Sequence, residues 1–160
     1  MSYRFRPATR LDLPMLQAWL ETPDVLRWWG DPAEQYSLLR EDLDEPGMTM
    51  LIVSSEGADF AYAQHYEVHR WPQPHFEHLP VGARAIDAFI GVPAMIGKGH
   101  GGAFLRVLAT DLIAAGVPVV AIDPDIANMR ARAAYMAAGF VEDGIVESGE
   151  GLVARMIFAG

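Results

Sequence analysis

The stretch Ile96-Gly97-Lys98-Gly99-His100-Gly101-Gly102 decides the fold of this chain, because four glycines in six residues lead into an apolar segment over 103–115. That segment predicts a helix, and Gly116 is placed to end it as a C-terminal cap. Glycines leave backbone N–H groups uncovered at a helix N-terminus, where the helix dipole also favours an anion. The stretch therefore predicts a cradle for a pyrophosphate, with Lys98 as an added point charge. A flexible loop whose glycines only allow tight turns is the alternative.

Two phosphate-binding fingerprints resemble this stretch, and their spacing argues against both. Three of its glycines satisfy G-x-G-x-x-G, and Asp123 follows about twenty residues later, as in a dinucleotide-binding unit. However, Pro93 and several further residues separate the preceding strand from the glycines, where that unit needs an immediate strand-to-helix turn. The 58 residues after Gly102 are also too few for the other half of a doubly wound domain. A P-loop needs Gly-Lys-Ser/Thr after a longer spacer, and here Gly99 follows Lys98.

Outward from the glycines, the hydrophobic pattern predicts strands and helices along the whole chain. The expected strands are 3–7, 48–54, 60–68, 85–91, 117–122, 141–147 and 152–158. The expected helices are one that starts at an Asp12 N-cap and is broken by Thr22-Pro23, then 33–44, 103–115 and 128–138. A turn over 28–32, hairpin turns at 56–59 and 148–151, and a long loop over 71–82 connect them. This order predicts an α/β (α+β) fold with a mixed sheet and helices on both faces.

Length and composition indicate one globular domain. The chain has 160 residues, 51% of them hydrophobic, so a single domain over residues 1–160 is expected. No apolar run approaches the ~20 residues that a membrane span needs, and the first six residues lack the apolar stretch of a secretory signal. The absence of cysteine excludes a disulfide framework and a thiolate zinc site. We therefore expect a cytoplasmic protein with no membrane partner.

The charge balance narrows the class of partner. Twenty-one acidic residues against twelve basic ones give a net charge of −9. That balance disfavours nucleic acid, because neutralising phosphates needs clusters of basic side chains. It would instead attract a cationic small molecule.

Six short motifs, in matching order and spacing, resemble the GNAT acetyltransferase superfamily, and most closely its aminoglycoside 6'-N-acetyltransferases. They are Trp28-Trp29-Gly30, Ala61-Tyr62-Ala63-Gln64-x-Tyr66, Ile86-Asp87, Ile96-Gly97-Lys98-Gly99-x-Gly101, Asp123-Pro124 and Ala134-Tyr135-x-x-Ala138-Gly139-Phe140. The resemblance covers essentially the whole chain and implies a mostly antiparallel central sheet with a splayed parallel strand pair. It also implies that acetyl-CoA is the acyl donor and that its pyrophosphate is bound by Ile96, Gly97, Lys98, Gly99, His100, Gly101 and Gly102. The chain departs from the superfamily at Ile96, where Gln or Arg is usual, but this position contributes mainly a backbone contact.

Two aspartates are candidates for work on the acceptor amine. Acetyl transfer needs a neutral nitrogen, whereas an alkyl ammonium has a pKa of about 10, so a base must help. Asp87 closes the strand before the glycine stretch, and Asp123 follows the strand beyond it. Each could hold a cationic amine, and either could accept its proton directly or through water. The resemblance implies that Asp87 binds and deprotonates the acceptor and that Asp123 anchors it; an ordinary helix cap is the alternative for Asp123.

Three further residues are expected to contact the acyl donor. Tyr135 corresponds to the superfamily's general acid, which protonates the departing thiolate. A phenol suits this role because a free thiol titrates at about pH 8.5, although packing on the helix is the alternative. Asn128 corresponds to the position whose amide touches the pantetheine arm. The strand backbone near Phe89 is expected to polarise the thioester carbonyl.

The acceptor contacts implied by the resemblance lie mostly in the first half of the chain. One of Trp28 and Trp29 is expected against a sugar ring, although both also suit a core at a helix end. The other expected contacts are Asp31, Gln64, Tyr66 and Glu67. The loop 71–82 is expected to border the pocket and set its specificity.

Neighbouring histidines raise the question of a metal. His65, His69, His75 and His78 are close in sequence, but the first two span a strand and its end, where a spacing of four does not gather ligands as it does on a helix. The implied reaction needs no metal, so none is expected, and a hydrated loop is favoured.

Two other functions remain open at this point. One is acetylation of another small amine, such as a polyamine, an amino sugar or a peptide amine. The other is non-catalytic binding of an acyl-CoA or an aminoglycoside. Asp87 and Tyr135 favour an enzyme, since binding alone needs neither base nor acid. A monomer or a homodimer is expected.

Overall fold

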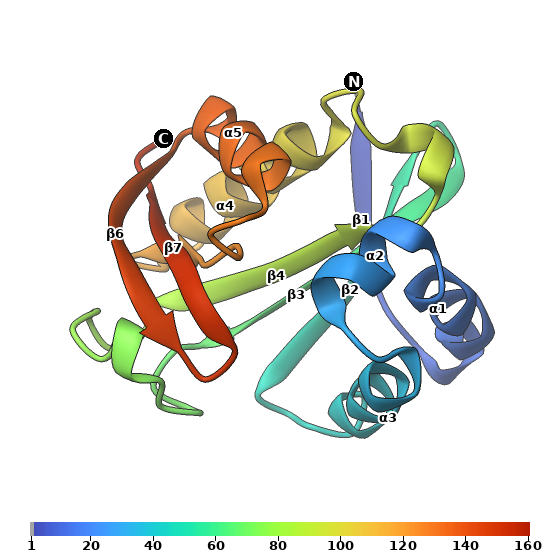
Figure 1. Ribbon diagram of the computed structural model, residues 1–160, viewed down its shortest axis with the longest axis horizontal. Coiled ribbons are helices and arrows are strands. Elements are labelled where there is room, and N and C mark those ends of the chain that lie inside the picture. The colour runs from blue at the N-terminus through green and yellow to red at the C-terminus, as the bar shows by residue number, and fades with distance from the viewer. Residues whose placement is uncertain (1) are drawn as a thin grey trace. The chain divides into compact units, whose positions relative to one another are not determined.

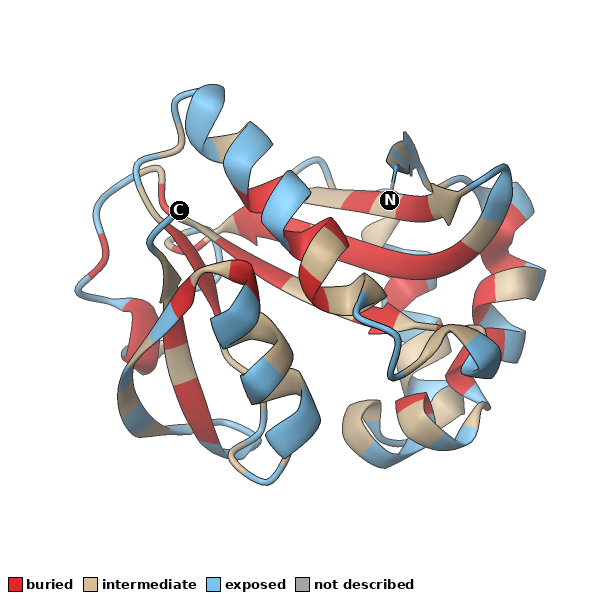
Figure 2. Cartoon of the chain, turned by 90° about the horizontal axis from the view of Figure 1, so that it is seen from above, coloured by how far each residue is buried: buried red, intermediate tan, exposed pale blue. Residues whose placement is uncertain are grey.

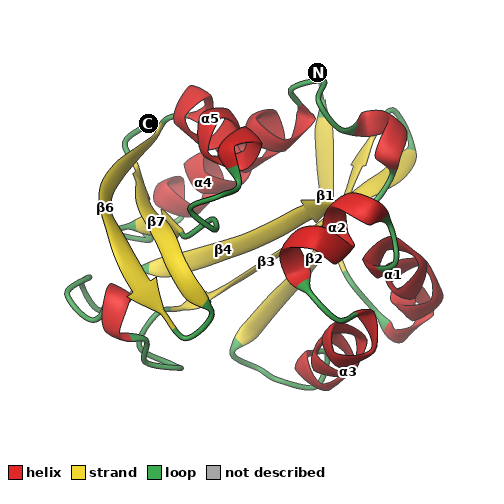
Figure 3. Cartoon of the chain, viewed as in Figure 1, coloured by secondary structure: helices red, strands yellow, loops and turns green. Residues whose placement is uncertain are grey.

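The computed structural model describes residues 2–160, which form a seven-stranded mixed sheet with helices (Figures 1 and 3). The strands are β1 (Tyr3–Pro7), β2 (Met48–Ser55), β3 (Ala58–Glu67), β4 (Arg84–Ile90), β5 (Val120–Ile122), β6 (Phe140–Ser148) and β7 (Gly151–Phe158). The helices are α1 (Leu13–Leu20), α2 (Pro23–Trp29), α3 (Pro32–Asp42), α4 (His100–Ala114) and α5 (Met129–Ala138), with the 3₁₀ turns η1 (Arg10–Asp12), η2 (Pro74–Phe76) and η3 (Pro93–Met95). The strand order is β1-β2-β3-β4-β5-β7-β6, with β4 and β5 parallel, so the predicted mixed sheet is confirmed.

The chain divides into two compact units, and strands β3 and β4 contribute residues to both. The first unit comprises the described residues up to Gln64 together with Ala88–Lys98. The second comprises His65–Asp87 and Gly99–Gly160. The glycine stretch is therefore divided between the units after Lys98.

The strands of the first unit begin with an antiparallel pair. Strand β1 pairs with β2 from Tyr3↔Ser55 to Pro7↔Leu51. Strands β2 and β3 are joined by Glu56 and Gly57, whose φ angles of 52° and 81° both lie in the left-handed region. Two such residues in succession match the tight turns whose twist suits a hairpin. The hairpin expected at 56–59 is thus confirmed.

A helix that the sequence did not predict follows α1. Thr22-Pro23 was expected only to break the chain, but Thr22 takes the N-cap position and Pro23 the first position of α2. Proline is tolerated there because its fixed φ is helical and its missing N–H would have no partner in the first turn. Trp28 and Trp29 consequently lie at the end of α2 and not in a turn.

The expectation that the Asp12 side chain caps a helix is only partly right. Its carboxylate accepts hydrogen bonds from Arg6 at 2.9 and 2.7 Å and from the Thr9 N–H at 2.8 Å. The Thr9 bond completes a capping box for η1, whereas α1 receives no side-chain cap from Asp12. The bonds from Arg6 hold the pKa of the Asp12 carboxyl below its usual value. Asp12 therefore joins η1 to strand β1.

The core of the first unit gathers apolar side chains from its helices and strands. Helix α1 contributes one buried face, as its periodicity predicts. The buried members are Leu16, Trp19, Leu20, Val25, Leu39, Met50, Ile52, Tyr62 and Phe89. Figure 2 shows this pattern along the chain, with strands largely buried and helices alternating buried and exposed positions.

The sheet of the second unit has a short parallel pair at its centre. Strands β4 and β5 are paired only at Arg84↔Val120 and Ala85↔Ala121, although β4 continues well beyond. Strand β5 then pairs antiparallel with β7, and β7 with β6. The strand expected over 117–122 forms only from Val120, because Pro118 has no N–H for a ladder. The parallel pair thus separates just where the two aspartates follow.

Glycines follow the ends of both helices of the second unit, and a glycine also precedes the first of them. Helix α4 begins at His100, earlier than expected, with Gly99 at its N-cap in the left-handed region, and Gly116 follows its end. Helix α5 lies where predicted, with Asn128 as its N-cap and Gly139 after its last turn. Within residues 2–160, no helix has both the length and the apolar character that crossing a membrane requires.

Candidate active site

The two candidate aspartates occupy equivalent positions on adjacent parallel strands of the second unit. The last paired residues are Ala85 on β4 and Ala121 on β5. Asp87 and Asp123 each lie two residues further along, where the pairing has ended. Asp123 follows β5 as expected, but the expectation that Asp87 closes its strand is wrong, because β4 continues to Ile90. Parallel strands run in the same direction, so both carboxylates lie at the same edge of the separated pair.

The charges of both carboxylates act on a third residue, Tyr66. Its ring is buried on β3, and its hydroxyl oxygen accepts a hydrogen bond from Gln73 Nε2 at 2.8 Å. Burial raises the pKa of the phenol strongly, and the charges of Asp87 and Asp123 raise it further, against the smaller opposing effect of Gln73. Tyr66 therefore keeps its proton at neutral pH. It is a neutral hydroxyl within the electrostatic influence of two carboxylates.

Asp123 has a partner that the sequence did not indicate. His75 Nε2 lies 2.8 Å from Asp123 Oδ2, and the His75 side chain is 1% exposed against 18% for Asp123. The expectation of a hydrated histidine loop is wrong for His75, which is buried. His65 is buried as well, on the strand where it was expected. Asp123 follows a strand as predicted, and its carboxylate accepts a hydrogen bond from a histidine. Because the Asp123 side chain is still 18% exposed, a ligand can reach it.

Glu67 holds the base of the loop that follows β3. Its Oε2 accepts from the His69 N–H at 2.9 Å and its Oε1 from the Gly82 N–H at 3.0 Å. Both carboxylate oxygens thus bind backbone at opposite ends of the predicted specificity loop. This is a loop-closing role that the sequence did not indicate, and contact between Glu67 and an acceptor stays a prediction.

The glycine stretch has the local geometry expected of an exposed backbone cradle. Gly97 and Gly99 have φ angles of 77° and 85°, and both are exposed together with Lys98. The first helical hydrogen bond of α4 runs from the Ala103 N–H to the Gly99 carbonyl. The three preceding amides, those of residues 100–102, therefore have no acceptor within the helix and suit an anion.

Gly102 has a packing role in addition to the predicted one. It is buried, and a Cβ built on it would lie 2.7 Å from the carbonyl oxygen of Ala134 in α5. A side chain at this position would force α4 and α5 apart. Packing alone therefore accounts for this glycine, and its amide contact with a pyrophosphate stays a prediction.

Helix α5 carries the two remaining candidates of the second unit. Tyr135 is partly buried, with its ring centroid 6.3 Å from that of Phe140. Asn128 Oδ1 accepts from the Ala131 N–H at 3.2 Å and so caps the helix. Any contact of Asn128 with a pantetheine arm would then fall to its amide nitrogen, which suits the carbonyl groups of that arm.

The candidates of the first unit are anchored mainly in its core. Trp29 meets the rings of Tyr62 and Phe89 edge-on, with centroids 6.3 and 5.0 Å away. Gln64 Oε1 accepts from the Tyr62 hydroxyl at 2.7 Å. The core reading of Trp29 is therefore supported, and the buried ring of Phe89 serves that core as well.

Two further candidates of the first unit have local structural partners. The Arg27 guanidinium lies over the ring of Trp28, 4.7 Å from the centroid of that ring. The Asp31 carboxylate accepts from the Glu34 N–H and caps α3. Contacts of these residues with a sugar ring or an amine stay predictions.

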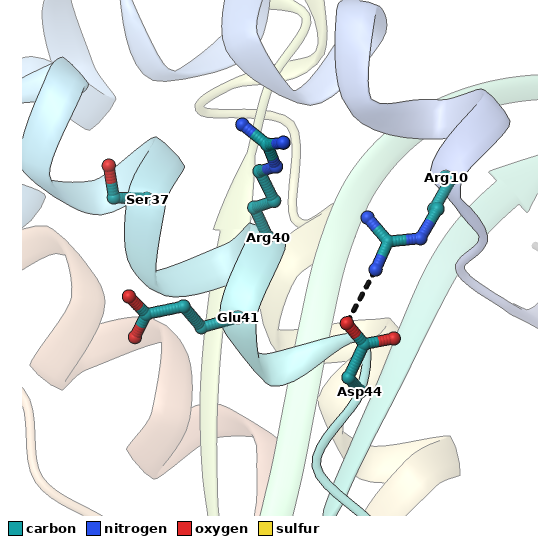
Figure 4. A pocket seen from close by; sticks show the side chains of 5 residues that line it. All are labelled: Arg10, Ser37, Arg40, Glu41 and Asp44. Carbon is teal, nitrogen blue, oxygen red and sulfur yellow. Dashed lines mark hydrogen bonds and ion pairs between the residues drawn. The ribbon is translucent and has the colours of Figure 1, made fainter.

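A separate surface hollow lies on the first unit. Its volume is about 390 Å³. Figure 4 shows the side chains that line it, including the ion pair of Arg10 with Asp44. Its lining residues are Arg10, Ser37, Arg40, Glu41 and Asp44, so it involves none of the candidate site residues. Among residues 2–160, no three His, Asp or Glu side chains gather as a metal site would require.

Sequence reasoning missed Gln73 and His75. Both lie in the proline-containing loop that was expected to border a pocket, but their partners are Tyr66 and Asp123. His75 and Asp123 are 48 positions apart, and no periodicity relates a loop residue to a distant strand end. The polar residues of a loop expected to be functional were the only available signal.

A parallel pair whose pairing ends just before two carboxylates, together with a helix opened by glycines, is the arrangement expected of an acyl-CoA-dependent N-acyltransferase. The chain belongs to the acetyltransferase (GNAT) domain family, whose sequence profile matches residues 8–148. The predicted family and its enzyme class, an acetyl-CoA-dependent N-acetyltransferase, are thereby confirmed.

Relatives of known function resemble the chain over nearly its whole length. It is 31% identical to the aminoglycoside N(6')-acetyltransferase type 1 of Klebsiella pneumoniae, over 98% of this chain and 82% of that protein. The structure of AAC(6')-Ib with paromomycin and acetyl-CoA has 29% identity and a TM-score of 0.87, over 99% of this chain and 93% of the other. AAC(6')-Ib with coenzyme A and kanamycin has 30% identity and a TM-score of 0.85, over 98% and 94%.

Proposed function

We propose that this enzyme transfers the acetyl group of acetyl-CoA directly to the 6'-amine of an aminoglycoside. The observation that carries the proposal is the pair Asp87 and Asp123 beside the protonated Tyr66, at the edge where β4 and β5 part. Two carboxylates next to a neutral hydroxyl donor suit a ligand that bears both ammonium and hydroxyl groups. Relatives at 31% identity are named for this acceptor and this position.

Asp87 and Tyr135 are proposed to move the protons. Asp87 binds the acceptor ammonium, accepts one proton from it and releases that proton to solvent. The neutral nitrogen then attacks the thioester carbonyl, so that a C–N bond forms and the C–S bond breaks. Tyr135 donates its proton to the departing thiolate, and the proton lost by the acetylated nitrogen returns to Tyr135 through water.

The acyl donor is proposed to bind at the start of α4. The amides of residues 100–102, which have no acceptor within the helix, and the open backbone at Gly97 and Gly99 fit a pyrophosphate. Lys98 adds a positive charge, and Ile96 contributes its backbone. The amide nitrogen of Asn128 and the backbone near Phe89 are proposed to contact the pantetheine arm and the thioester carbonyl.

Acceptor specificity is proposed to come from Tyr66 and the loop after β3. Gln73 donates to the Tyr66 oxygen, which leaves the phenol proton for an acceptor of its own, such as a sugar hydroxyl. Asp123 anchors a second ammonium group or the reacting one. The remaining proposed acceptor contacts are Trp28, Trp29, Asp31, Gln64 and Glu67.

The partners, domain organisation, location and oligomeric state of the enzyme are proposed from its charge and from the extent of the family match. A net charge of −9 suits a cationic substrate and argues against nucleic acid or an anionic membrane as partner. The family match spans residues of both compact units, which supports one catalytic domain in a cytoplasmic monomer or homodimer. In a host exposed to aminoglycosides, this activity would confer resistance.

The test is a panel of amines assayed by release of the CoA thiol. Kanamycin- and tobramycin-like substrates should be acetylated, and Asp87→Asn should lower kcat by at least ~100-fold, the usual scale of acid–base catalysis. An unchanged rate in this variant would reject Asp87 as the base. Turnover confined to polyamines, amino sugars or peptides would reject the aminoglycoside acceptor, and binding without any turnover would indicate a non-catalytic module.

A further inference from the structure

His75 is a buried polar side chain for which the proposed reaction has no role. It lies in η2, within the loop between β3 and β4, and its side chain is 1% exposed. Its Nε2 is 2.8 Å from Asp123 Oδ2, so an imidazole and a candidate substrate-binding carboxylate are directly hydrogen-bonded.

The surroundings of His75 Nδ1 indicate which group donates in the bond between His75 Nε2 and Asp123. Within residues 2–160, His75 Nδ1 is the one buried side-chain nitrogen or oxygen with no hydrogen-bond partner. A proton on Nδ1 would be a buried donor without an acceptor, which is costly. The geometry therefore favours the neutral tautomer that carries its proton on Nε2 and donates it to Asp123.

The position of the imidazole is fixed from its backbone side as well. Arg155 Nη1 donates to the His75 carbonyl oxygen at 3.0 Å, and Arg155 Nε donates to Asp143 Oδ1 at 2.6 Å. Arg155 lies on β7 and Asp143 on β6, so the closing hairpin holds η2 in place. The His75 ring also packs against that of Phe76, with centroids 4.1 Å apart.

We propose that His75 is a positioning residue that orients Asp123 for the acceptor, an inference that rests on the proposed function. By occupying Oδ2, it fixes the plane of the carboxylate and leaves Oδ1 to receive the ammonium group. His75 does not relay the substrate proton, because Nδ1 is buried and leads to no acceptor. Its contribution therefore falls on acceptor binding and not on the chemical step.

Two substitutions separate the hydrogen bond from the packing of the ring. His75→Phe keeps a ring against Phe76 but removes the donor to Asp123, whereas His75→Gln places an amide N–H close to the position of Nε2. His75→Phe should raise KM for kanamycin about 10-fold, the scale of a hydrogen bond to a charged group, with kcat and KM for acetyl-CoA within about 3-fold of wild type. His75→Gln should recover most of the lost affinity.

His69→Phe is the matched control for disturbance of the loop. His69 lies in the same loop, and its Nε2 contacts the Leu79 carbonyl at 2.8 Å instead of a carboxylate. Any rise of KM for kanamycin in this variant reports disturbance of the loop alone, and it should be clearly smaller than the rise in His75→Phe. An equal rise of KM in both histidine variants, or no rise in His75→Phe, would overturn the positioning role while wild-type turnover keeps the proposed function intact.

The tautomer provides a readout that does not depend on turnover. Nitrogen-15 NMR of labelled histidine should show a protonated Nε2 and a bare Nδ1 for His75, assigned by the signals missing from His75→Gln. These signals should shift in Asp123→Asn. A proton on Nδ1 would overturn the inference whatever the substrate, whereas a wild-type enzyme inactive on every aminoglycoside would overturn the proposed function and with it the acceptor role of this contact.

Discussion

His65 illustrates how a single buried base can make folding depend on pH. Its Nδ1 accepts a hydrogen bond from Arg84 Nε at 2.7 Å, and the ring is buried on β3. Burial, and secondarily the charge of Arg84, lowers the pKa of His65 to about 4. Burial also lowers the pKa of Arg84. The pair is stable only while the imidazole remains neutral.

We expect acid to destabilise the protein through His65. Between pH 6.5 and about 4 the unfolded chain binds a proton at this residue that the folded chain does not. The free energy of unfolding should therefore fall by up to about 3 kcal/mol as the pH drops through that window. Below about pH 4, His65 should cause no further change. Urea titrations at closely spaced pH values measure this slope.

His65→Asn is the matched variant that tests the loss of stability between pH 6.5 and about 4. An Asn oxygen can accept from Arg84 Nε but does not titrate, so the slope between pH 6.5 and 4 should flatten. An undiminished slope in His65→Asn would assign the acid sensitivity to another group. Asp12, whose pKa is lowered by Arg6, acts in a separate window below its usual carboxyl pKa.

At the same scale, strand patterns in the sequence placed the candidate site residues only in part. Asp123 could be placed because it follows the apolar run of β5, whereas Asp87 lies within β4 and not at its end, and only the pairing of β4 with β5 stops before it. The contact of His75 with Asp123 could not be predicted, because it depends on how a loop packs under a hairpin. The loop-closing bonds of Glu67 depend on the same packing.

At the scale of elements, the glycines of the α4 region are required for two different reasons. Gly97 and Gly99 have open space around the position of a Cβ, but their left-handed φ angles disfavour any side chain. Gly102 has an ordinary helical conformation but no room, because α5 approaches it closely. The sequence alone treats all three as loop glycines.

Gly102→Ala should therefore destabilise the packing of α4 against α5. A Cβ 2.7 Å from the Ala134 carbonyl oxygen requires one helix to shift, at a cost of about 1–3 kcal/mol in the free energy of unfolding. Thermal or urea denaturation measures the change. Gly149→Ala is the control, since nothing lies within 4 Å of its Cβ position, and it should stay within about 0.5 kcal/mol of wild type. Equal stability of the two variants would refute the close approach.

Helix α2 and strand β5 mark the limits of element prediction. Thr22-Pro23 was taken only as a break, although Thr at an N-cap, Pro at the first position and Asp24 in the first turn together indicate a helix start. Strand β5 proved shorter than its apolar run, because apolarity reports burial but Pro118 cannot join a ladder. Boundaries thus depended on backbone hydrogen bonding more than on hydrophobicity.

For the whole molecule, the surplus of negative charge bears on how a substrate reaches the site. A field of net charge −9 attracts a polycation at long range and repels the anionic acyl donor. Salt screens such effects, with a Debye length of about 10 Å at 0.1 M. Added salt should thus weaken the attraction of the cationic substrate and not that of the anionic acyl donor.

We expect kcat/KM for an aminoglycoside to fall about 3- to 10-fold as NaCl rises from about 10 to about 300 mM, because screening weakens its attraction to the acidic protein. The value for acetyl-CoA, with the acceptor saturating, should stay level or rise. Initial rates over a salt series measure both, with sucrose as the control for osmotic effects. A parallel fall for the two substrates would indicate a general loss of activity and not screening.

The two hydrogen bonds of Glu67 suggest how such an enzyme could acquire a new acceptor. Because they join His69 to Gly82, the strands on either side keep their spacing whatever the intervening segment contains. Insertions, deletions or a transplanted segment between these anchor points would then reshape the rim around the amine while leaving Asp87 in register on β4. Diversification of antibiotic range could thus proceed by changing the exposed positions of this one segment, while the buried His75 and Phe76 stay in place and the scaffold that performs the chemistry is not rebuilt.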